Sequence, residues 1–355
     1  MKRIVICCDG TWNRPDQMSG GRICPTNVTH IATATAGEDA AGTLQLVYYQ
    51  PGVGTRRGER IMGGAFGAGL SRNVLEAYRF LIKHYAPGDE LFLFGFSRGA
   101  YTARSLVGFI RNSGLLRREH EELMGAAYAL YRRRDGDSHP RERESQLFRR
   151  TYSYEAMGHE VHVKCLGVWD TVGALGIPIG RTEAFVRGLL RLRFHDLELS
   201  SRVEHAFHAV AVDERRRPYV PSLWKQPKEK PPQHIEQVWF AGAHSNVGGG
   251  YPDARPSDIA LAWMIERARA CGLAFYPAYL DRHIDVRSLG EVRDSRTGIF
   301  RLLPSHVREV CAEDPDFVAY ERIHQSVVER LRSDASYRPG NLPRDIDRFL
   351  ERPSG

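Results

Sequence analysis

A serine in a setting suited to nucleophilic catalysis is the most informative feature of this chain. Ser97 is the centre of the pentapeptide GFSRG, which follows an apolar run at 90–94 and precedes a helical pattern that extends to about residue 112. A strand, a sharp turn and a helix in this order project a serine hydroxyl from the end of a sheet. The adjoining helix N-terminus carries partial positive charge that favours an oxyanion, and the flanking glycines remove Cβ clashes. The pattern predicts that Ser97 is a nucleophile.

A serine hydroxyl needs a general base near neutral pH, and His244 is the predicted base. His244 follows an apolar run at 235–241 and begins the glycine-rich segment HSNVGGGY, which allows a loop to bring the imidazole toward Ser97. In hydrolases with a GxSxG serine the histidine comes last of the three catalytic residues along the chain. His205 and His208 are weaker candidates, because the pattern over 180–215 predicts mostly helix.

The base in turn needs a carboxylate that orients it, and two aspartates compete for this role. Asp170 directly ends a buried run at 161–168, in the sequence VWDTVG, and is the preferred acid. Asp213 closes a predicted helical run and precedes a cluster of charged residues, where an ion pair or a helix cap explains it more simply. Both remain candidates at this point.

The first apolar run, at 3–8, ends within the sequence CCDGT, and the loop that follows is a further candidate part of the site. An Asp-x-Asp-Gly-Thr ending would indicate a phosphatase with an aspartyl nucleophile, but the first position here is Cys7. We therefore expect the loop after Asp9 to supply backbone donors. The amides of Gly10 and Thr11, together with that of Arg98 beside the serine, are predicted to line an oxyanion hole.

Nothing in the sequence indicates a cofactor or a metal ion. The glycines at 248–250 lack the Lys-Ser/Thr of a phosphate-binding loop, and the glycine-rich stretch at 63–69 lacks the spacing of a dinucleotide fingerprint. Neither HxH nor HExxH nor CxxC occurs. The six cysteines are therefore expected to be free thiols, and neither a cofactor nor a metal is expected.

Apolar runs that alternate with helical patterns predict an α/β fold with a mostly parallel central sheet flanked by helices. Asp9, Ser97, Asp170 and His244 each follow a predicted strand directly. The carboxyl ends of parallel strands lie at one edge of a sheet, where such folds bind their ligands. The four residues are therefore expected to meet there.

The chain divides into a catalytic domain at 1–280 and a charged C-terminal extension at 281–355 that is expected to pack on it. Within the domain, residues 116–158 carry many Arg and Glu residues with a few apolar positions. This segment predicts a helical insertion or cap over the sheet.

The net charge of +7 fits either an arginine-rich surface or a surface that binds an anionic membrane. In the second case Arg149 and Arg150 of the insertion are expected to contact headgroups. No motif indicates nucleic-acid binding. The first apolar run is interrupted at Asp9, too early for a secretory signal, and no apolar run is long enough to span a membrane. A cytoplasmic protein is expected, and export without a cleaved signal is the alternative.

Five motifs occur together and in order: ICCDGTWN at 6–13, GFSRGAYTAR at 95–104, VWDTVG at 168–173, HAVAVDER at 208–215 and GAHSNVGGGY at 242–251. Together they resemble the α/β-hydrolase catalytic domain that includes type VI secretion phospholipase effectors, over residues 3 to about 265. The resemblance implies a triad of Ser97, Asp170 and His244, and esterase or phospholipase activity on membrane lipids. At Asn246 the family motif usually has an aspartate.

These observations predict a serine hydrolase that cleaves carboxylic esters, phospholipids among them, through an acyl-enzyme on Ser97, with His244 as base and Asp170 as orienter. The alternative is a module on a hydrolase scaffold that binds a partner or a lipid surface without catalysis, because a fold does not determine function.

Overall fold

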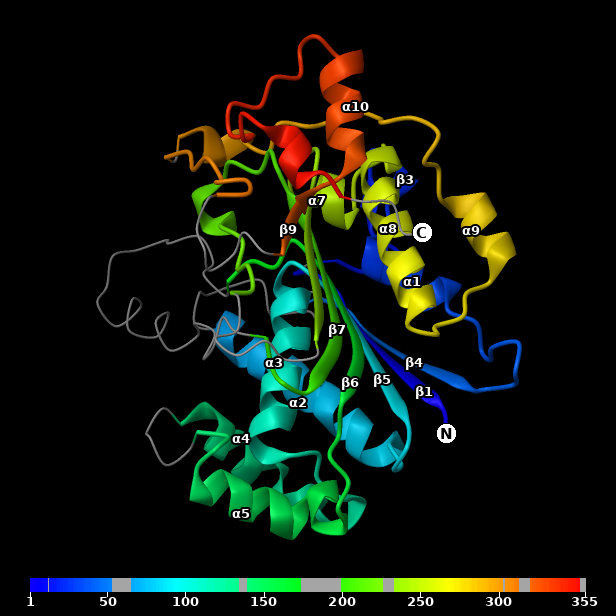
Figure 1. Cartoon of the computed structure of the whole chain (residues 1–355), viewed down its shortest axis with the longest axis vertical. Helices are drawn as coiled ribbons and strands as arrows, with labels where there is room; N and C mark the ends of the chain where they lie inside the picture. Colours follow the sequence, from blue (N-terminus) through cyan, green and yellow to red (C-terminus); the bar gives the residue numbers. More distant parts are fainter. Residues whose placement is uncertain are drawn as a thin grey trace.

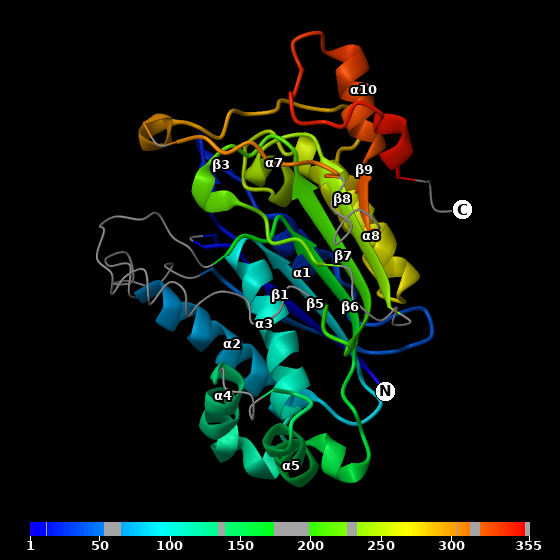
Figure 2. The ribbon, with the colours of Figure 1, turned by 60° about the vertical axis from the view of Figure 1, so that its left-hand side comes forward.

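Seven parallel strands form the central sheet in the computed structural model of the chain (Figures 1 and 2). In spatial order they are β4 (Gln45–Gln50), β1 (Arg3–Cys8), β5 (Glu90–Phe96), β6 (Val163–Trp169), β7 (Val203–Ala211), β8 (His234–Phe240) and β9 (Glu321–Ile323). The structure describes residues 1–11, 13–52, 65–133, 139–173, 199–225, 233–302, 304–312 and 320–351. The predicted α/β fold with a parallel sheet is confirmed.

The strand order changes direction at β1. From β1 the chain proceeds to β4 on one side, and then crosses to β5 on the other side of β1. A crevice for ligands forms outside the carboxyl ends of the strands at such a point. Asp9 and Ser97 directly follow the two strands involved, so the sheet topology itself brings these two chain segments together.

Helices cover both faces of the sheet. On one face lie α2 (Ala65–His84) and α3 (Arg98–Ser113), and on the other lie α1 (Asn27–Ala34) and α8 (Arg255–Ala270). The remaining helices are α4 (Met124–Arg132), α5 (Arg143–Tyr152), α7 (His244–Gly248), α9 (Pro277–His283) and α10 (Gln325–Ser333). Because both faces are covered, β1 and β5 are almost continuous apolar runs.

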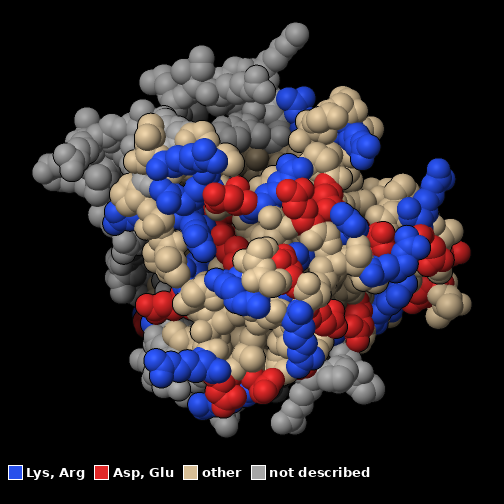
Figure 3. All heavy atoms as spheres, turned by 90° about the horizontal axis from the view of Figure 1, so that it is seen from above, with Lys and Arg blue, Asp and Glu red and all other residues tan. Residues whose placement is uncertain are grey.

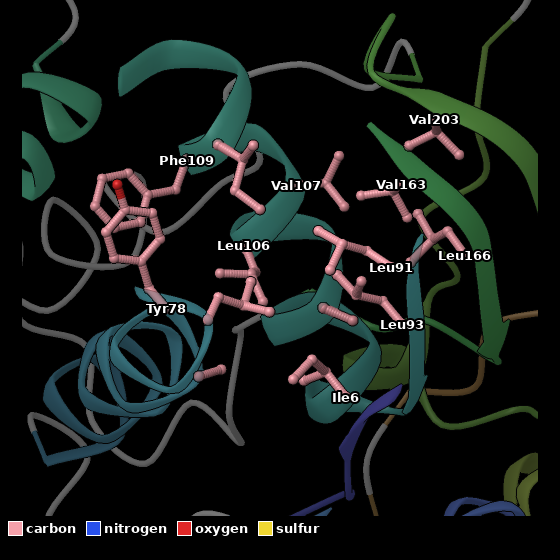
Figure 4. Packing of buried hydrophobic residues seen from close by; sticks show 14 of the residues in the cluster. Ile6, Tyr78, Leu91, Leu93, Leu106, Val107, Phe109, Val163, Leu166 and Val203 are labelled. Atoms are coloured by element: carbon pink, nitrogen blue, oxygen red, sulfur yellow. The ribbon is translucent and has the colours of Figure 1, made fainter. Parts of the chain in front are cut away.

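The core between the sheet and α3 fixes the helix that begins at Ser97. Ile6 and Leu93 of the sheet belong to the same buried cluster as Leu106 and Phe109 of α3 (Figure 4). Phe109 also stacks on Tyr78 of α2, with ring centroids 4.1 Å apart. This packing holds α3 in place against the sheet, so the N-terminus of the helix is held at the strand ends.

The prediction of helix over 180–215 is wrong for its second half. Residues Val203–Ala211 form β7, which pairs with β6 and β8, while residues 180–198 lie outside the described part. The strand is buried on both faces and carries His205 and His208 in its interior, so it lacks the alternation of apolar and polar residues that marks a half-buried strand. Asp213 therefore follows a strand rather than a helix.

The described residues of the segment 116–158 are mostly helical, and they do not cover the carboxyl ends of the strands. Its helices α4 and α5 pack on α3, with α5 near its C-terminal end, and they lie far from α7 in both views (Figures 1 and 2). Arg149 is buried, where it pairs with Glu155 at 2.9 Å and donates to the Asn112 carbonyl. Arg149 thus ties α5 to α3 and is not a surface residue available to a membrane.

The described residues of the predicted extension at 281–355 add a strand to the sheet. Its strand β9 pairs in parallel with β8, and α10 follows directly. Trp239 of β8 donates its indole N–H to Glu321 of β9 at 2.6 Å. None of the described helices is long and apolar enough to cross a membrane.

Candidate active site

Ser97 occupies a strained turn between β5 and α3. Its backbone has φ 58° and ψ −120°, a conformation that is costly for a residue with a Cβ and that clusters at functional sites. Its amide donates to the Trp169 carbonyl at 3.0 Å, so Ser97 extends the pairing of β5 with β6. A Cβ on Gly99 would lie 2.1 Å from the Cys8 carbonyl oxygen. Only glycine at 99 lets α3 begin so close to the end of β1.

Asp170 and His244 come from the ends of two other strands, and their side chains meet. The carboxylate Oδ2 of Asp170 lies 2.5 Å from Nδ1 of His244, and both side chains are buried. Asp170 itself has a positive φ of 38°, and its Oδ1 accepts the Ala211 amide at 3.1 Å. The contact through Nδ1 leaves Nε2 as the ring nitrogen for a proton transfer.

The imidazole of His244 also contacts two aromatic rings. Phe96, the residue before the serine, has its ring 4.6 Å from that of His244, and Tyr219 approaches edge-on at 4.9 Å. The serine turn and the histidine are thus neighbours through Phe96. A Cβ on Gly248 would lie 2.0 Å from the Phe96 ring. Only a glycine at position 248 therefore lets α7 pack this close to Phe96.

Electrostatics keep this pair in the state that a general base requires. Burial alone would raise the pKa of Asp170, but the cation of Arg308 and the His244 imidazole outweigh burial and hold that pKa well below its usual value. Burial lowers the pKa of His244 more than its contact with Asp170 raises it. The histidine is therefore neutral and the aspartate ionised at neutral pH.

Arg308 is a member of the site that sequence reasoning missed. Its side chain is almost fully buried, and its guanidinium donates to both carboxylate oxygens of Asp170, at 2.6 Å to Oδ1 and 3.0 Å to Oδ2. The residue lies in the charged extension, where nothing in the sequence distinguishes it from the many other arginines. Its role depends on a contact across 138 positions of the chain.

Glu214 and Arg216 form a second charged pair beside the histidine. Glu214 accepts the backbone amide of His244 at 3.2 Å and pairs with Arg216 at 2.8 Å. The Arg216 guanidinium lies over the Tyr219 ring, 3.7 Å from its centroid. Burial would raise the pKa of Glu214, but Arg216 outweighs it and lowers that pKa. The pair thus anchors the start of α7 and one aromatic wall of the site.

The alternative candidates have other partners. Asp213 accepts the Gly242 amide at 2.6 Å and the Tyr337 hydroxyl at 2.8 Å. His208 accepts the Thr171 amide at 3.0 Å and is wholly buried. His205 lies on β7 with its ring near those of two neighbouring aromatic side chains. Of the two candidate acids, Asp170 is the one that contacts the His244 imidazole.

The loop after β1 is organised by Asp9. This buried carboxylate accepts the hydroxyls of Thr26 at 2.7 Å and Tyr49 at 2.6 Å, and its Oδ1 accepts the Gly10 amide at 2.6 Å. The Gly10 amide, one of the three expected oxyanion donors, therefore points to its neighbour's carboxylate. The Thr11 hydroxyl is enclosed and has no hydrogen-bond partner among the described residues.

Gly10 nevertheless lies next to the serine, since a Cβ on it would be 3.3 Å from the Cβ of Ser97. The loop that begins at Asp9 and the turn at Ser97 therefore form adjacent walls of one site. The ends of β1 and β5 thus lie side by side, as the sequence predicted for these two segments.

Asn246, at the position where the resembled family has an aspartate, uses both ends of its amide. Its Oδ1 accepts the backbone amides of Ala243 at 3.2 Å and Arg293 at 3.1 Å, and its Nδ2 donates to the Glu291 carbonyl at 3.1 Å. Asn246 thus joins α7 to the C-terminal extension. In the part of the chain that is described, no group of His, Cys, Asp or Glu residues is arranged to hold a metal ion.

Charge on the end of the molecule above the strand termini is mixed. Viewed from this end, Lys and Arg side chains are interspersed with Asp and Glu side chains among the described residues (Figure 3). The net charge of +7 is therefore not gathered into one uninterrupted basic patch on this face.

Comparison with known proteins identifies the family. The family model described as "T6SS, Phospholipase effector Tle1-like, catalytic domain" matches residues 2–267, and the chain belongs to this family. The uncharacterized protein YEL023C of Saccharomyces cerevisiae is 31% identical over 253 residues, which are 63% of this chain and 34% of that protein. The chain thus spans about a third of the length of this relative.

Two solved structures are also similar. A crystal structure of an uncharacterized protein from Pseudomonas aeruginosa matches with a TM-score of 0.44 and 20% identity, over 81% of this chain and 48% of that one. The structure of the Tle1 effector bound to the VgrG spike from the type 6 secretion system matches with a TM-score of 0.43 and 19% identity, over 71% and 51%. The chain spans about half of each.

Proposed function

We propose that this protein is a serine hydrolase that cleaves a carboxylic ester of a phospholipid. The observation that carries the proposal is the buried contact of 2.5 Å between His244 Nδ1 and Asp170 Oδ2. The serine with a strained backbone directly follows Phe96, whose ring lies 4.6 Å from that of His244. Membership of the Tle1-like phospholipase effector family supports a lipid ester as the substrate class.

In the proposed reaction His244 Nε2 takes the proton of the Ser97 hydroxyl as Ser97 Oγ attacks the ester carbonyl. Asp170 stabilises the imidazolium that forms. The tetrahedral intermediate collapses as the imidazolium gives its proton to the leaving alcohol, which leaves an acyl group on Ser97. Water, activated by the same histidine, then attacks the acyl-enzyme and releases the fatty acid and the free serine.

The negative charge on the carbonyl oxygen needs donors in place before the reaction. We assign this role to the Arg98 amide at the first residue of α3 and to Thr11, through its amide or its enclosed hydroxyl. Gly10 is left out of this set because its amide donates to Asp9. The expectation of three backbone donors is thus reduced to two residues.

A fluorophosphonate probe and a panel of phospholipids test the proposal. Wild-type protein should take up one probe molecule and release fatty acid from at least one phospholipid, and Ser97→Ala should abolish both. Ser105→Ala is the matched control, since Ser105 is buried on the same helix and lies two turns further along. The control variant should still be labelled.

Labelling that persists in Ser97→Ala would overturn the assignment of the nucleophile. A folded wild-type protein that reacts with neither probe nor ester, yet binds lipid vesicles or a partner, would favour the non-catalytic binding module instead.

A further inference from the structure

Asp170, the acid of the proposed triad, contacts two partners: the imidazole of His244 and the guanidinium of Arg308. Asp170 Oδ2 faces His244 Nδ1 on one side, and both of its oxygens accept the Arg308 guanidinium on the other. Arg308 is fixed in turn by the carbonyls of Ala211 at 2.7 Å and Tyr219 at 2.6 Å. Two hydrogen bonds hold the planar Arg308 guanidinium on two backbone carbonyls, and two more join it to the Asp170 carboxylate. This arrangement restricts the rotation of the carboxylate.

The origin of Arg308 sets it apart from the rest of the site. The family model ends at residue 267, whereas Arg308 lies 41 residues beyond it, in the extension that also supplies β9. Three residues further on, Cys311 has a positive φ of 48°, one of three such non-glycine residues in the described part, and the other two are Ser97 and Asp170. The chain is thus strained near the place where the extension enters the site.

We propose that Arg308 is a positioning residue of the hydrolase, which clamps Asp170 in the orientation that receives His244 and tunes the proton affinity of the Asp170–His244 pair. This inference rests on the proposed function for its meaning in catalysis, but the clamp itself can be tested without any activity. Asp170 is then held in place by a residue that lies outside the part of the chain matched by the family model, residues 2–267.

The sign of the effect follows from charge. A cation beside the carboxylate disfavours any further proton on the Asp170–His244 pair, whichever of the two residues carries it. Removing that cation should raise the apparent pKa of the pair, so the acid limb of the pH profile moves to higher pH. At the separations present here, a charge effect of this kind corresponds to a shift of about one pH unit or more.

Other charged and titratable groups also face the pair. Glu214 and Arg216 lie on the chain after β7, Tyr219 follows them, and His208 lies within β7. Burial and the neighbouring Arg104 lower the pKa of His208 to about 3, so His208 remains neutral across the range of the assay. Protonation of His208 is therefore not expected to contribute to the shift.

The test separates charge from geometry with two substitutions. Arg308→Met removes the cation and should move the acid limb of kcat/KM upward by about one unit. Arg308→Lys keeps a cation but loses the fork, so its acid limb should stay near that of the wild type while kcat falls. Arg330→Met is the matched control, because Arg330 is a buried arginine of the same extension that donates to the carbonyls of Leu289 and Gly290. Its acid limb should not move.

The same clamp is measured without turnover by following the His244 ring in Ser97→Ala protein by NMR as pH is varied. Adding Arg308→Met to that background should raise the pH at which the ring titrates, and adding Arg330→Met should not. Unchanged titration and an unchanged acid limb in folded Arg308→Met protein would overturn the inference. If the wild type proves inactive while the NMR shift is present, the proposed function fails and the clamp stands.

Discussion

Replacing Asp170 with asparagine should cost both stability and activity, for two separable reasons. The substitution leaves the Arg308 guanidinium buried without its counter-ion, while its hydrogen bonds to the Ala211 and Tyr219 carbonyls persist. Two opposite charges about 4 Å apart interact by about 4 kcal/mol at an effective dielectric constant of 20. Measured losses on breaking a buried pair are about 3–5 kcal/mol. We expect the free energy of unfolding of Asp170→Asn to fall by roughly this amount.

The double variant Asp170→Asn/Arg308→Met distinguishes the two effects. Removing the unpaired cation should restore about 2 kcal/mol of the lost stability. Activity should stay low, because an asparagine cannot stabilise the imidazolium and selects the wrong tautomer of His244, a change that lowers kcat by about 10⁴-fold in a serine protease.

Urea denaturation followed by tryptophan fluorescence, together with an ester assay on the same samples, measures both quantities. Arg287→Met serves as the control, since Arg287 forms an exposed pair with Asp285 whose loss should leave the free energy of unfolding unchanged. An Asp170→Asn variant as stable as the wild type, or a double variant in which the two single effects simply add, would refute an energetic coupling between Asp170 and Arg308.

If the enclosed Thr11 hydroxyl contributes to the oxyanion hole, Thr11→Val should lower kcat by about 10- to 100-fold, whereas Thr11→Ser should retain most activity. Equal rates for the two variants in an ester assay would leave only the Thr11 amide in that role. Gly99→Ala should be unfolded, or destabilised by roughly 3 kcal/mol or more, in a thermal melt. The new methyl group would lie 2.1 Å from the Cys8 carbonyl oxygen, which is backbone of the central sheet and cannot move away. A melting curve like that of the wild type would contradict this prediction. Burial lowers the pKa of His30 to about 4 and that of His208 to about 3, so the unfolded chain takes up protons below about pH 6.5 that the folded chain refuses. Stability should therefore decrease by up to about 2 kcal/mol for each histidine between pH 6.5 and pH 5, measured by urea midpoints, and a flat profile would show that these rings accept protons in the folded state.

The sequence predicted the parts of the site that depend on local pattern. A glycine-flanked serine between an apolar run and a helix specifies its own turn, and Asp170 and His244 each follow a strand that the pattern identifies. Because parallel strands place their carboxyl ends at one edge, the contact between Asp170 and His244 could be inferred from the sequence.

What could not be predicted depends on contacts between distant segments. The strand β7 carries His205 and the buried His208, so it lacks the alternation of apolar and polar residues of a half-buried strand and was predicted as helix. The helices at 116–158 were expected over the site, but α5 is anchored to the far end of α3 by the buried Arg149. No local signal separates Arg308 from an arginine on the surface, since its partner lies 138 positions earlier in the chain.

The order in which the chain is synthesised gives the clamp from the extension a further consequence. A nascent chain presents Ser97, Asp170 and His244 well before residue 308, and translation adds residues at roughly 5–20 per second. Until β9 and Arg308 arrive, the sheet has an open edge beside β8 and the acid lacks its fixed neighbour. The site is therefore expected to mature only after residue 308 has been synthesised. The extension thereby couples the fixed orientation of Asp170 to the pairing of β9 with β8.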